Sequence, residues 1–448
     1  MKKLKLISPC AHRFTDKGSA KYHFPPLSLA VLAANTPNEF DIEIIDENYQ
    51  DINLNDYLDA DLIGITSMTA TVKRGYEIAD FFRKHGITVI MGGHHVSALP
   101  EEALQHADVV IVGEGDILWR QVTEEFLDNK PLHGIYSSTE PVSLDNLPLP
   151  REDLYPKDAK YLIRANTHMT RGCPNNCAFC SVTTFSPKFR KRPVDEVIAE
   201  MKYLKENFVD ETNRIVFNDD NPTLDKKYAK ELFRKMIPLN LKWQTFAGID
   251  IAEDDELLDL MKKAGCTGAL IGFDAMNIED IESMHKYKNK NTDYTQIVKK
   301  IQNEFGIPVI AGVVVGFDHD TVETFDKIIK FLDESLVSNL TFNILYPYPG
   351  TKLYEQFKRE NRITSYDWDN YVLDGINFVP KNMTQKELHD GYLSVLKWYS
   401  DDKQLERRLE NAKKTAMGEI GAMMIRDWHA GVKRAYQECL RGENKIRY

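Results

Sequence analysis

Several features that mark secreted, membrane-spanning and nucleic-acid-binding proteins are scarce in this sequence. The 448 residues include only 6 cysteines, and half of these lie in one short stretch, so an extended disulfide framework is excluded. No segment has the roughly eighteen consecutive apolar residues of a transmembrane helix, and residues 1–8 lack the apolar core of a secretory signal. We therefore expect a cytoplasmic protein without a transmembrane segment.

Positive charge is also scarce. Lys and Arg number 57 against 68 Asp and Glu, and the net charge of −11 argues against a general nucleic-acid binder. The basic run at 188–192 is better interpreted as a solvated turn than as an anion site. Apolar and charged fractions of 42% and 28% are those of an ordinary globular protein, and the length predicts two or three domains.

The most informative residues are three clustered cysteines. Cys173, Cys177 and Cys180 follow a strand-like run in C-x3-C-x2-C spacing. Thiolates are soft ligands, and three on one loop can bind three irons of a cubane cluster while the fourth iron stays open to another ligand. Two alternatives remain: a disulfide with a spare thiol, which fits a reducing compartment poorly, and a structural zinc site with His168 as the fourth ligand.

The loop Thr170-Arg-Gly-Cys-Pro-Asn-Asn-Cys-Ala-Phe-Cys-Ser181, with Phe179 before its third cysteine, resembles the cluster motif of the radical S-adenosylmethionine (SAM) superfamily. In that family the three cysteines bind a 4Fe-4S cluster, and SAM chelates the open iron through its amino and carboxylate groups. The resemblance therefore implies that Cys173, Cys177 and Cys180 are metal ligands and that Phe179 lies beside the cofactors.

Residues 1–140 alternate short apolar strands with amphipathic helices, which predicts a doubly wound, Rossmann-like parallel sheet. The expected strands cover 4–8, 42–46, 62–67, 87–92 and 109–113. Ligands on such a sheet bind beyond the carboxyl ends of its strands. The polar and glycine residues at those ends form a candidate binding rim: Ser67, Gly92, Gly93, His94, Gly113 and Glu114.

This segment resembles the cobalamin (B12)-binding domain that precedes many radical SAM cores. Gly92-Gly-His-His95 and Gly113-Glu-Gly115 stand where that family has similar phrases, which implies that the rim contacts cobalamin. The D-x-H-x-x-G motif, whose histidine binds cobalt from below, is absent, since Asp46 is followed by Glu47-Asn48. Some radical SAM relatives bind cobalamin without this histidine, and others keep the domain but have lost the cofactor.

Four prolines punctuate the next stretch, so we interpret 141–160 as a linker. Residues 161–363 again alternate strands and helices, which predicts a partial (β/α)6 barrel of the TIM type, with its chemistry at the carboxyl ends of the strands. The expected strands cover 162–169, 215–218, 242–247, 268–273, 309–317 and 341–345.

Polar residues at these strand ends are further candidates for cofactor binding. The polar run Asn218-Asp-Asp-Asn221 follows the second strand, and Asp219 and Asn221 are its candidates for cofactor binding. A helix cap is the alternative role for one of the two carboxylates, Asp219 or Asp220. In the radical SAM family, the acidic residue of a Gly-x-Glu phrase at the fourth strand contacts SAM. The resemblance transfers that role to Asp274, whose side chain is shorter, and places Gly316 near the adenine.

Residues 364–448 form a polar, helix-rich tail with expected helices at 388–399 and 407–437. Such a tail could cover the mouth of the barrel, dock a partner or touch a membrane surface, or simply pack on the core. No catalytic residue that quenches or relays a radical is identifiable in it or elsewhere.

The resemblance extends to the subgroup of hopanoid methylases and of lipid- and tetrapyrrole-modifying enzymes. It implies that a reduced cluster cleaves SAM to a 5′-deoxyadenosyl radical, and that cobalamin delivers a methyl group to an unactivated carbon of a lipid or small metabolite. A flavodoxin or ferredoxin would supply electrons. The alternatives are a cobalamin-free radical SAM enzyme that couples carbons, rearranges a substrate or inserts sulfur, and, in another class, an iron–sulfur electron carrier.

Overall fold

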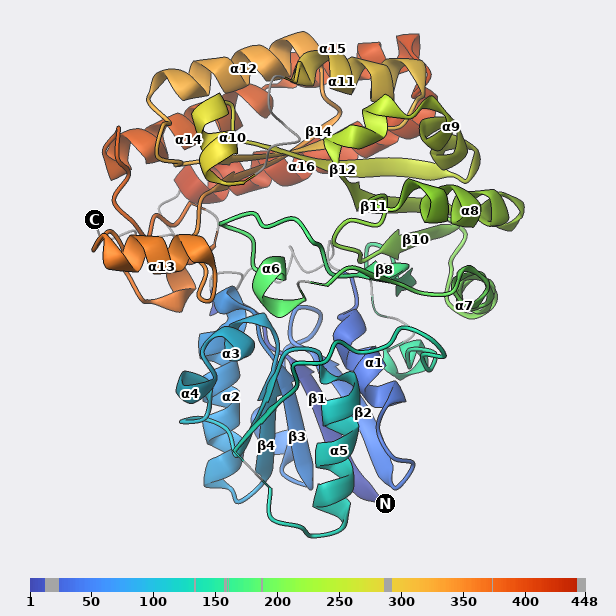
Figure 1. Ribbon diagram of the computed structural model, residues 1–448, viewed down its shortest axis with the longest axis vertical. Helices are drawn as coiled ribbons and strands as arrows, with labels where there is room; N and C mark the ends of the chain where they lie inside the picture. The colour runs from blue at the N-terminus through green and yellow to red at the C-terminus, as the bar shows by residue number, and fades with distance from the viewer. Residues whose placement is uncertain are drawn as a thin grey trace.

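The computed structural model describes residues 1–12, 24–132, 134–156, 159, 161–186, 188–285, 292–372 and 374–440. Two α/β units lie one below the other in Figure 1, the first in blue to teal and the second in green to red. The linker expected over 141–160 is therefore described only in part, and residues 441–448 of the expected tail lie outside the described residues.

The first unit is a doubly wound parallel sheet, as the sequence predicted. Its strand order is β2-β1-β3-β4-β5-β6, and every neighbouring pair is parallel. The strands are β1 (Lys2–Ser8), β2 (Phe40–Asp46), β3 (Leu62–Thr66), β4 (Thr88–Gly92), β5 (Val109–Val112) and β6 (Ile135–Ser137). The last strand was not expected, because three residues carry no readable periodicity.

Helices cover both faces of this sheet, so its strands are buried on both sides. The helices are α1 (Leu27–Ala34), α2 (Val72–Lys84), α3 (His94–Ala98), α4 (Pro100–Ala103) and α5 (Gly115–Leu127). One apolar cluster includes Ile65 of β3 and Ile78 of α2, and the opposite one includes Leu6 of β1 and Trp119 of α5.

The second unit is a partial barrel, also as predicted. Its parallel strands run in the order β14-β13-β12-β11-β10-β7, and in the described chain β7 and β14 are its two edges. The strands are β7 (Asn166–Thr167), β10 (Arg214–Phe217), β11 (Lys242–Ala247), β12 (Cys266–Asp274), β13 (Val309–Val315) and β14 (Asn339–Ile344). The helices around it are α7 (Val194–Asn207), α8 (Lys226–Met236), α9 (Asp255–Lys263), α10 (Ile278–Ser283), α11 (Tyr294–Lys299), α12 (Glu323–Ser335) and α13 (Lys352–Arg359).

The first barrel strand is much shorter than the expected 162–169. After Thr167 the chain leaves the ladder because the amides of Met169 and Thr170 donate to the Asp219 carboxylate instead of to a neighbouring strand. The next strand, β8 (Thr170–Arg171), pairs antiparallel with β9 (Arg190–Lys191). The chain between these two strands contains the cysteine loop and the short helix α6 (Val182–Phe185). Figure 1 shows α6 and β8 between the two units.

Three helices close the chain: α14 (Gln385–Tyr399), α15 (Asp402–Lys414) and α16 (Gly418–Leu440). The expected single helix over 407–437 is wrong. The helix breaks because Thr415 is extended, the Ala416 amide donates to the Asn303 carbonyl, and Gly418 adopts φ 59°. The Trp428 indole of α16 donates to the Leu340 carbonyl at 2.8 Å, which fixes this helix against β14. No helix in the described ranges is both long and apolar enough to cross a bilayer.

Candidate functional site

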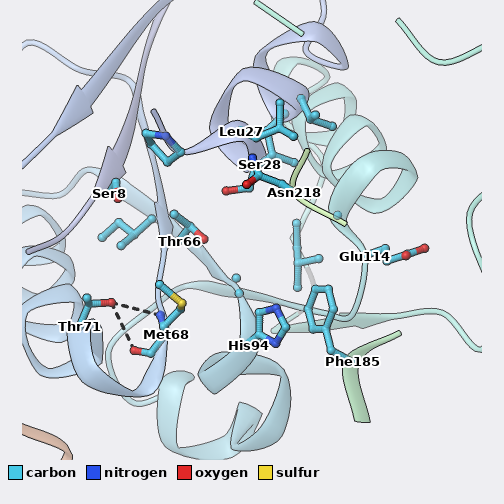
Figure 2. Close-up of a pocket in the computed structure, with 18 of the residues that line it drawn as sticks. Ser8, Leu27, Ser28, Thr66, Met68, Thr71, His94, Glu114, Phe185 and Asn218 are labelled. Carbon is cyan, nitrogen blue, oxygen red and sulfur yellow. Dashed lines mark hydrogen bonds between the residues drawn. The ribbon is translucent and has the colours of Figure 1, made fainter. Parts of the chain in front are cut away.

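A cavity of about 690 Å³ lies where the carboxyl ends of the first sheet face the cysteine loop. Its walls come from both units (Figure 2). The first unit contributes five of the six predicted rim residues, namely Gly92, Gly93, His94, Gly113 and Glu114, and the second contributes His168, Arg171, Asn218 and Asp220. The cavity is thus a shared space rather than a pocket of one unit.

Ser67, the sixth predicted rim residue, lies behind this surface. It is 1% exposed, and its neighbours Thr66 and Met68 line the cavity instead. Its amide donates to the Gly92 carbonyl at 2.9 Å. A Cβ on Gly93, which has φ 109°, would lie 2.5 Å from the Ser67 carbonyl oxygen. Gly93 is therefore required for this tight approach of two strand ends.

Gly113 has a different role. It also has positive φ, 85°, but no heavy atom lies within 4 Å of the position a Cβ would take. Its amide donates to the Ser97 hydroxyl at 2.9 Å. Gly113 therefore leaves open space next to the cavity, where a large ligand can approach the backbone.

His94 forms part of the cavity wall and touches the cysteine loop. Its ring stacks on Phe185 of α6, with centroids 4.2 Å apart and planes at 21°, and Figure 2 shows the two rings side by side. Its Nδ1 is buried without a hydrogen-bond partner among the described residues, and burial lowers its pKa. A neutral imidazole with an unused nitrogen is suited to contact a polar edge of a bound cofactor. His95, by contrast, is 1% exposed and bonds to Thr69 and Glu102.

The three cysteines lie half-buried on the loop between β8 and β9, and none forms a disulfide. The Cys173 amide donates to the Ser186 carbonyl at 3.3 Å, and the Cys180 amide to the Cys177 carbonyl at 3.2 Å. Among the described residues no three Cys, His, Asp or Glu side chains are arranged around one metal ion. Ligands of a cubane cluster bind separate irons and need not converge on one point, so this donor set fits a cluster.

Phe179 connects the loop to the barrel. Its ring packs edge-on against Phe317, with centroids 5.8 Å apart. The amides of Gly316 and Phe317 both donate to Asp320, and Gly316 has φ 104°. The end of β13, predicted to lie near SAM, is therefore next to the cysteine loop.

The two acidic residues after β10, Asp219 and Asp220, have different environments. Asp219 is 2% exposed and accepts from the Met169 amide and the Thr170 hydroxyl, and burial raises its pKa to about 7. It is not a helix cap, since Asp225 caps α8. Asp220 lines the cavity and accepts from the Gly172 amide at 2.9 Å. The sequence pointed to Asp220 as part of the polar run at this strand end, but Asp220 was not among the predicted cofactor contacts.

Two further candidates lie elsewhere in the barrel. Asn221 is 8% exposed and is not among the residues lining the cavity. Asp274 ends β12 with φ 54°, beside the strand that leads to Gly316. Predicted cofactor contacts by Asn221, Asp274 and Gly316 remain predictions.

His168 supports an arginine. Its Nε2 accepts from the Arg171 Nε at 3.1 Å, and burial, together with Arg171 and two further arginines, holds its pKa well below the ordinary value. The residue therefore stays neutral and orients Arg171. We assign it no role as the fourth ligand of a zinc site.

The sequence matches the radical SAM superfamily over residues 167–332, a B12 binding domain over 16–122 and a domain of unknown function (DUF4070) over 351–441. Bacteriochlorophyllide d C-8(2)-methyltransferase of Chlorobaculum tepidum is 30% identical, covering 83% of this chain and 85% of that protein. Hopanoid C-2 methylase of Rhodopseudomonas palustris is 27% identical, covering 77% of this chain and 66% of that protein.

Solved structures share the fold. The radical SAM methyltransferase TsrM from Kitasatospora setae, with cobalamin and a 4Fe-4S cluster bound, aligns with TM-score 0.65 at 16% identity, covering 88% of this chain and 82% of that chain. The cobalamin-dependent SAM radical enzyme OxsB, with aqua-cobalamin and SAM bound, aligns with TM-score 0.66 at 13% identity, covering 97% of this chain and 72% of that chain.

Proposed function

This chain belongs to the cobalamin-dependent radical SAM methyltransferase family, and on that premise we propose that it methylates an unactivated carbon of an apolar polycyclic or lipid molecule. The observation that supports the proposal best is the shared cavity. Its walls combine the rim of the B12-binding unit with residues that flank the cysteine loop, so a cofactor held by the first unit would face the cofactors of the second.

In this proposal Cys173, Cys177 and Cys180 hold the cluster. Gly113 would leave space for cobalamin at the strand ends, Gly93 keeps the ends of β3 and β4 close together beneath it, and His94 would contact its polar edge. Asp274 and Gly316 contact SAM at the ends of β12 and β13. When bound, the cluster supplies the electron that cleaves SAM, and cobalamin supplies a carrier for the methyl group. The protein's own contribution is to orient these groups and exclude water between the two units.

The substrate class is inferred from two considerations. Relatives are named for bacteriochlorophyllides and a hopanoid, which are rigid, largely apolar ring systems. The cavity wall is rich in apolar side chains, among them Leu27, Val31, Ile111 and Val182. A low-potential carrier such as flavodoxin or ferredoxin would reduce the cluster. Cytoplasmic location belongs to the same proposal.

The test is to supply anaerobic, cluster-reconstituted protein with cobalamin, reductant and SAM that carries an isotopically labelled methyl group, together with a chlorophyllide or a hopanoid. The proposal predicts label in the substrate together with S-adenosylhomocysteine and 5′-deoxyadenosine. 5′-Deoxyadenosine without transferred label would favour the cobalamin-free coupling, rearrangement or sulfur-insertion alternatives. Absence of all SAM-derived products would favour an electron carrier.

A further inference from the structure

The cysteine loop has a short two-stranded base with an unusual pair of charges. Arg171 in β8 lies directly opposite Arg190 in β9. Arg171 precedes Cys173 by two positions, and Arg190 follows Cys180, so the pair brackets all three cysteines. Two like charges facing each other across a ladder destabilise it unless each has a counterion.

Both counterions come from the other unit of the molecule. Arg171 donates from its two terminal nitrogens to the Asp116 carboxylate at 2.9 and 3.0 Å. Arg190 donates in the same forked manner to Glu114. The two acids flank Gly115, the first residue of α5, and both line the cavity. One turn at the end of β5 therefore holds both strands of the loop's base.

These pairs are largely removed from water. The side chains of Arg171 and Asp116 are 17% and 8% exposed, and those of Arg190 and Glu114 are 16% and 11% exposed. Burial alone would raise the pKa of Glu114, but Arg190 holds it below the ordinary value. Forked, partly buried pairs of this kind are stronger and more directional than surface ion pairs.

Glu114 and Arg190 also form hydrogen bonds to two neighbouring segments, at Val142 and at Ser186. Glu114 accepts from the Val142 amide at 3.2 Å and from the Ser186 hydroxyl at 3.1 Å. Arg190 donates to the Val142 carbonyl at 2.7 Å and to the same hydroxyl at 2.8 Å. The Ser186 carbonyl in turn accepts from the Cys173 amide. A continuous chain of contacts thus runs from the cavity rim through Ser186 to the first cysteine.

We propose that the forks Arg171–Asp116 and Arg190–Glu114 form a clamp of positioning residues that couples occupancy of the cavity by cobalamin to the geometry of the cysteine loop. The inference rests on the proposed function. A corrinoid bound against Gly113 and Glu114 favours one conformation of the turn at the end of β5. The same turn binds both strands at the base of the cysteine loop. By reciprocity, a loop ordered by its cluster presents a better-formed rim to the corrinoid.

Coupling is measured as the dissociation constant of hydroxocobalamin without the cluster divided by the dissociation constant with the cluster. Hydroxocobalamin is titrated anaerobically into the full chain, once with the reconstituted cluster and once without it, and binding is followed by the visible spectrum of cobalamin. For the natural sequence we expect about fivefold tighter binding, or more, when the cluster is present. The double variant Glu114→Gln/Arg190→Gln removes one of the two forks and the contacts that run through Ser186 to Cys173. Its ratio is expected to fall to about half of the natural value or less.

The matched control is Arg151→Gln/Asp153→Asn. Arg151 and Asp153 also form a forked pair, at 2.8 Å for both bonds, but it is exposed and lies within the linker. We expect its coupling ratio to equal that of the natural sequence. If the clamp variant does not fold, Ser186→Ala removes one shared contact of both partners and is expected to reduce the ratio by about half or more.

Two outcomes would overturn the inference: a ratio near 1 in the natural sequence, or an unchanged ratio in a clamp variant that binds both cofactors. If the clamp residues had only a structural role, the variant would bind hydroxocobalamin more weakly with and without the cluster. Both dissociation constants would then rise by the same factor, and their ratio would not change. Failure of the proposed function is distinguishable, since hydroxocobalamin would then bind neither form of the natural chain.

Discussion

Among the glycines that line the cavity, Gly93 is the one at which an added Cβ would meet the closest neighbour. The variant Gly93→Ala places a Cβ 2.5 Å from the Ser67 carbonyl oxygen, so the β3 and β4 ends must separate. We predict that hydroxocobalamin binds about tenfold more weakly or worse, while the cluster still assembles. Visible titration measures the affinity, and iron analysis measures the cluster.

Gly86→Ala is the matched control for that variant. Gly86 has φ 75°, so alanine there carries a similar backbone cost, but nothing lies within 4 Å of the new Cβ. If Gly86→Ala weakens cobalamin binding as much as Gly93→Ala, the effect is one of general stability, and the assignment of Gly93 to the cofactor rim is wrong.

Glu152 predicts a pH dependence of stability. The side chain is fully buried, neither carboxylate oxygen has a hydrogen-bond partner among the described residues, and burial raises its pKa to about 8. The folded protein therefore holds this proton more tightly than the unfolded chain. Its contribution to stability is complete below about pH 4.5 and is lost as the pH rises towards 8.

The measurement compares thermal unfolding midpoints of the natural chain and Glu152→Gln at pH 5.5 and pH 8.5. We expect the natural chain to lose roughly 3–8 °C relative to the variant between these pH values, because only its side chain becomes a buried charge, which Arg164 offsets only in part. Parallel curves for the two proteins would show that Glu152 does not titrate in this range.

At this scale the cysteines proposed as cluster ligands could be selected from the sequence, and the residues that support their loop could not. Three cysteines within eight positions indicate a metal cluster by their residue type and spacing alone. Arg171 lies within the same motif, but its function depends on Asp116, which is 55 residues away and belongs to a different unit. Local patterns contain no information about such a partner, because it is chosen by the packing of two sheets.

At the scale of elements, the loop between β8 and β9 carries the three cysteines proposed as cluster ligands. We predict that Cys177→Ala loses the iron and the visible absorption of the cluster, because a cubane held by two thiolates is weakly bound. SAM cleavage to 5′-deoxyadenosine is expected to fall below detection. Cys266→Ala is the control, since Cys266 is a buried thiol of β12, 3% exposed, and remote from the motif.

The C-terminal helices depend on one buried cation. Arg408 of α15 is 3% exposed, lies 3.7 Å from the centroid of the Tyr399 ring and donates to His429 Nδ1 of α16 at 2.9 Å. We predict that Arg408→Ala destabilises the packing of α15 and α16 by about 2–4 kcal/mol. Amide hydrogen exchange within both helices would accelerate, and that rate is the measurement.

Arg407→Ala serves as its control. Arg407 pairs with Asp333 at a half-exposed position, so its loss is expected to cost about 1 kcal/mol or less. Equal acceleration of exchange in the two variants would mean that the buried network around Arg408 does not hold these helices together.

Element boundaries show where sequence periodicity stops being informative. Most strands of both sheets were expected within a few residues, because apolar runs separated by amphipathic helices are a long-range pattern. The short β7 and the break between α15 and α16 were not foreseen. Each is produced by a tertiary hydrogen bond, from Met169 to Asp219 and from Ala416 to Asn303.

At the scale of the whole molecule, the arrangement explains why two α/β units occur in one chain. The carboxyl ends of the first sheet face the cysteine loop of the second, and the cavity lies between them. We propose that the domain division expected from the sequence be retained: 1–140, a linker at 141–160, the barrel at 161–363 and the tail at 364–448. The bond from the Trp428 indole of α16 to the Leu340 carbonyl of β14 supports packing on the barrel as the proposed role of the tail.

The most direct test of the account is the cobalamin content of the anaerobically purified, cluster-reconstituted protein, determined from its cobalt content and visible spectrum. The account predicts close to one cobalamin per chain after saturating supply, and strongly reduced content in Gly93→Ala. A chain that carries its cluster and cleaves SAM, yet binds no cobalamin, would contradict it and leave the first unit as a scaffold for a different radical reaction.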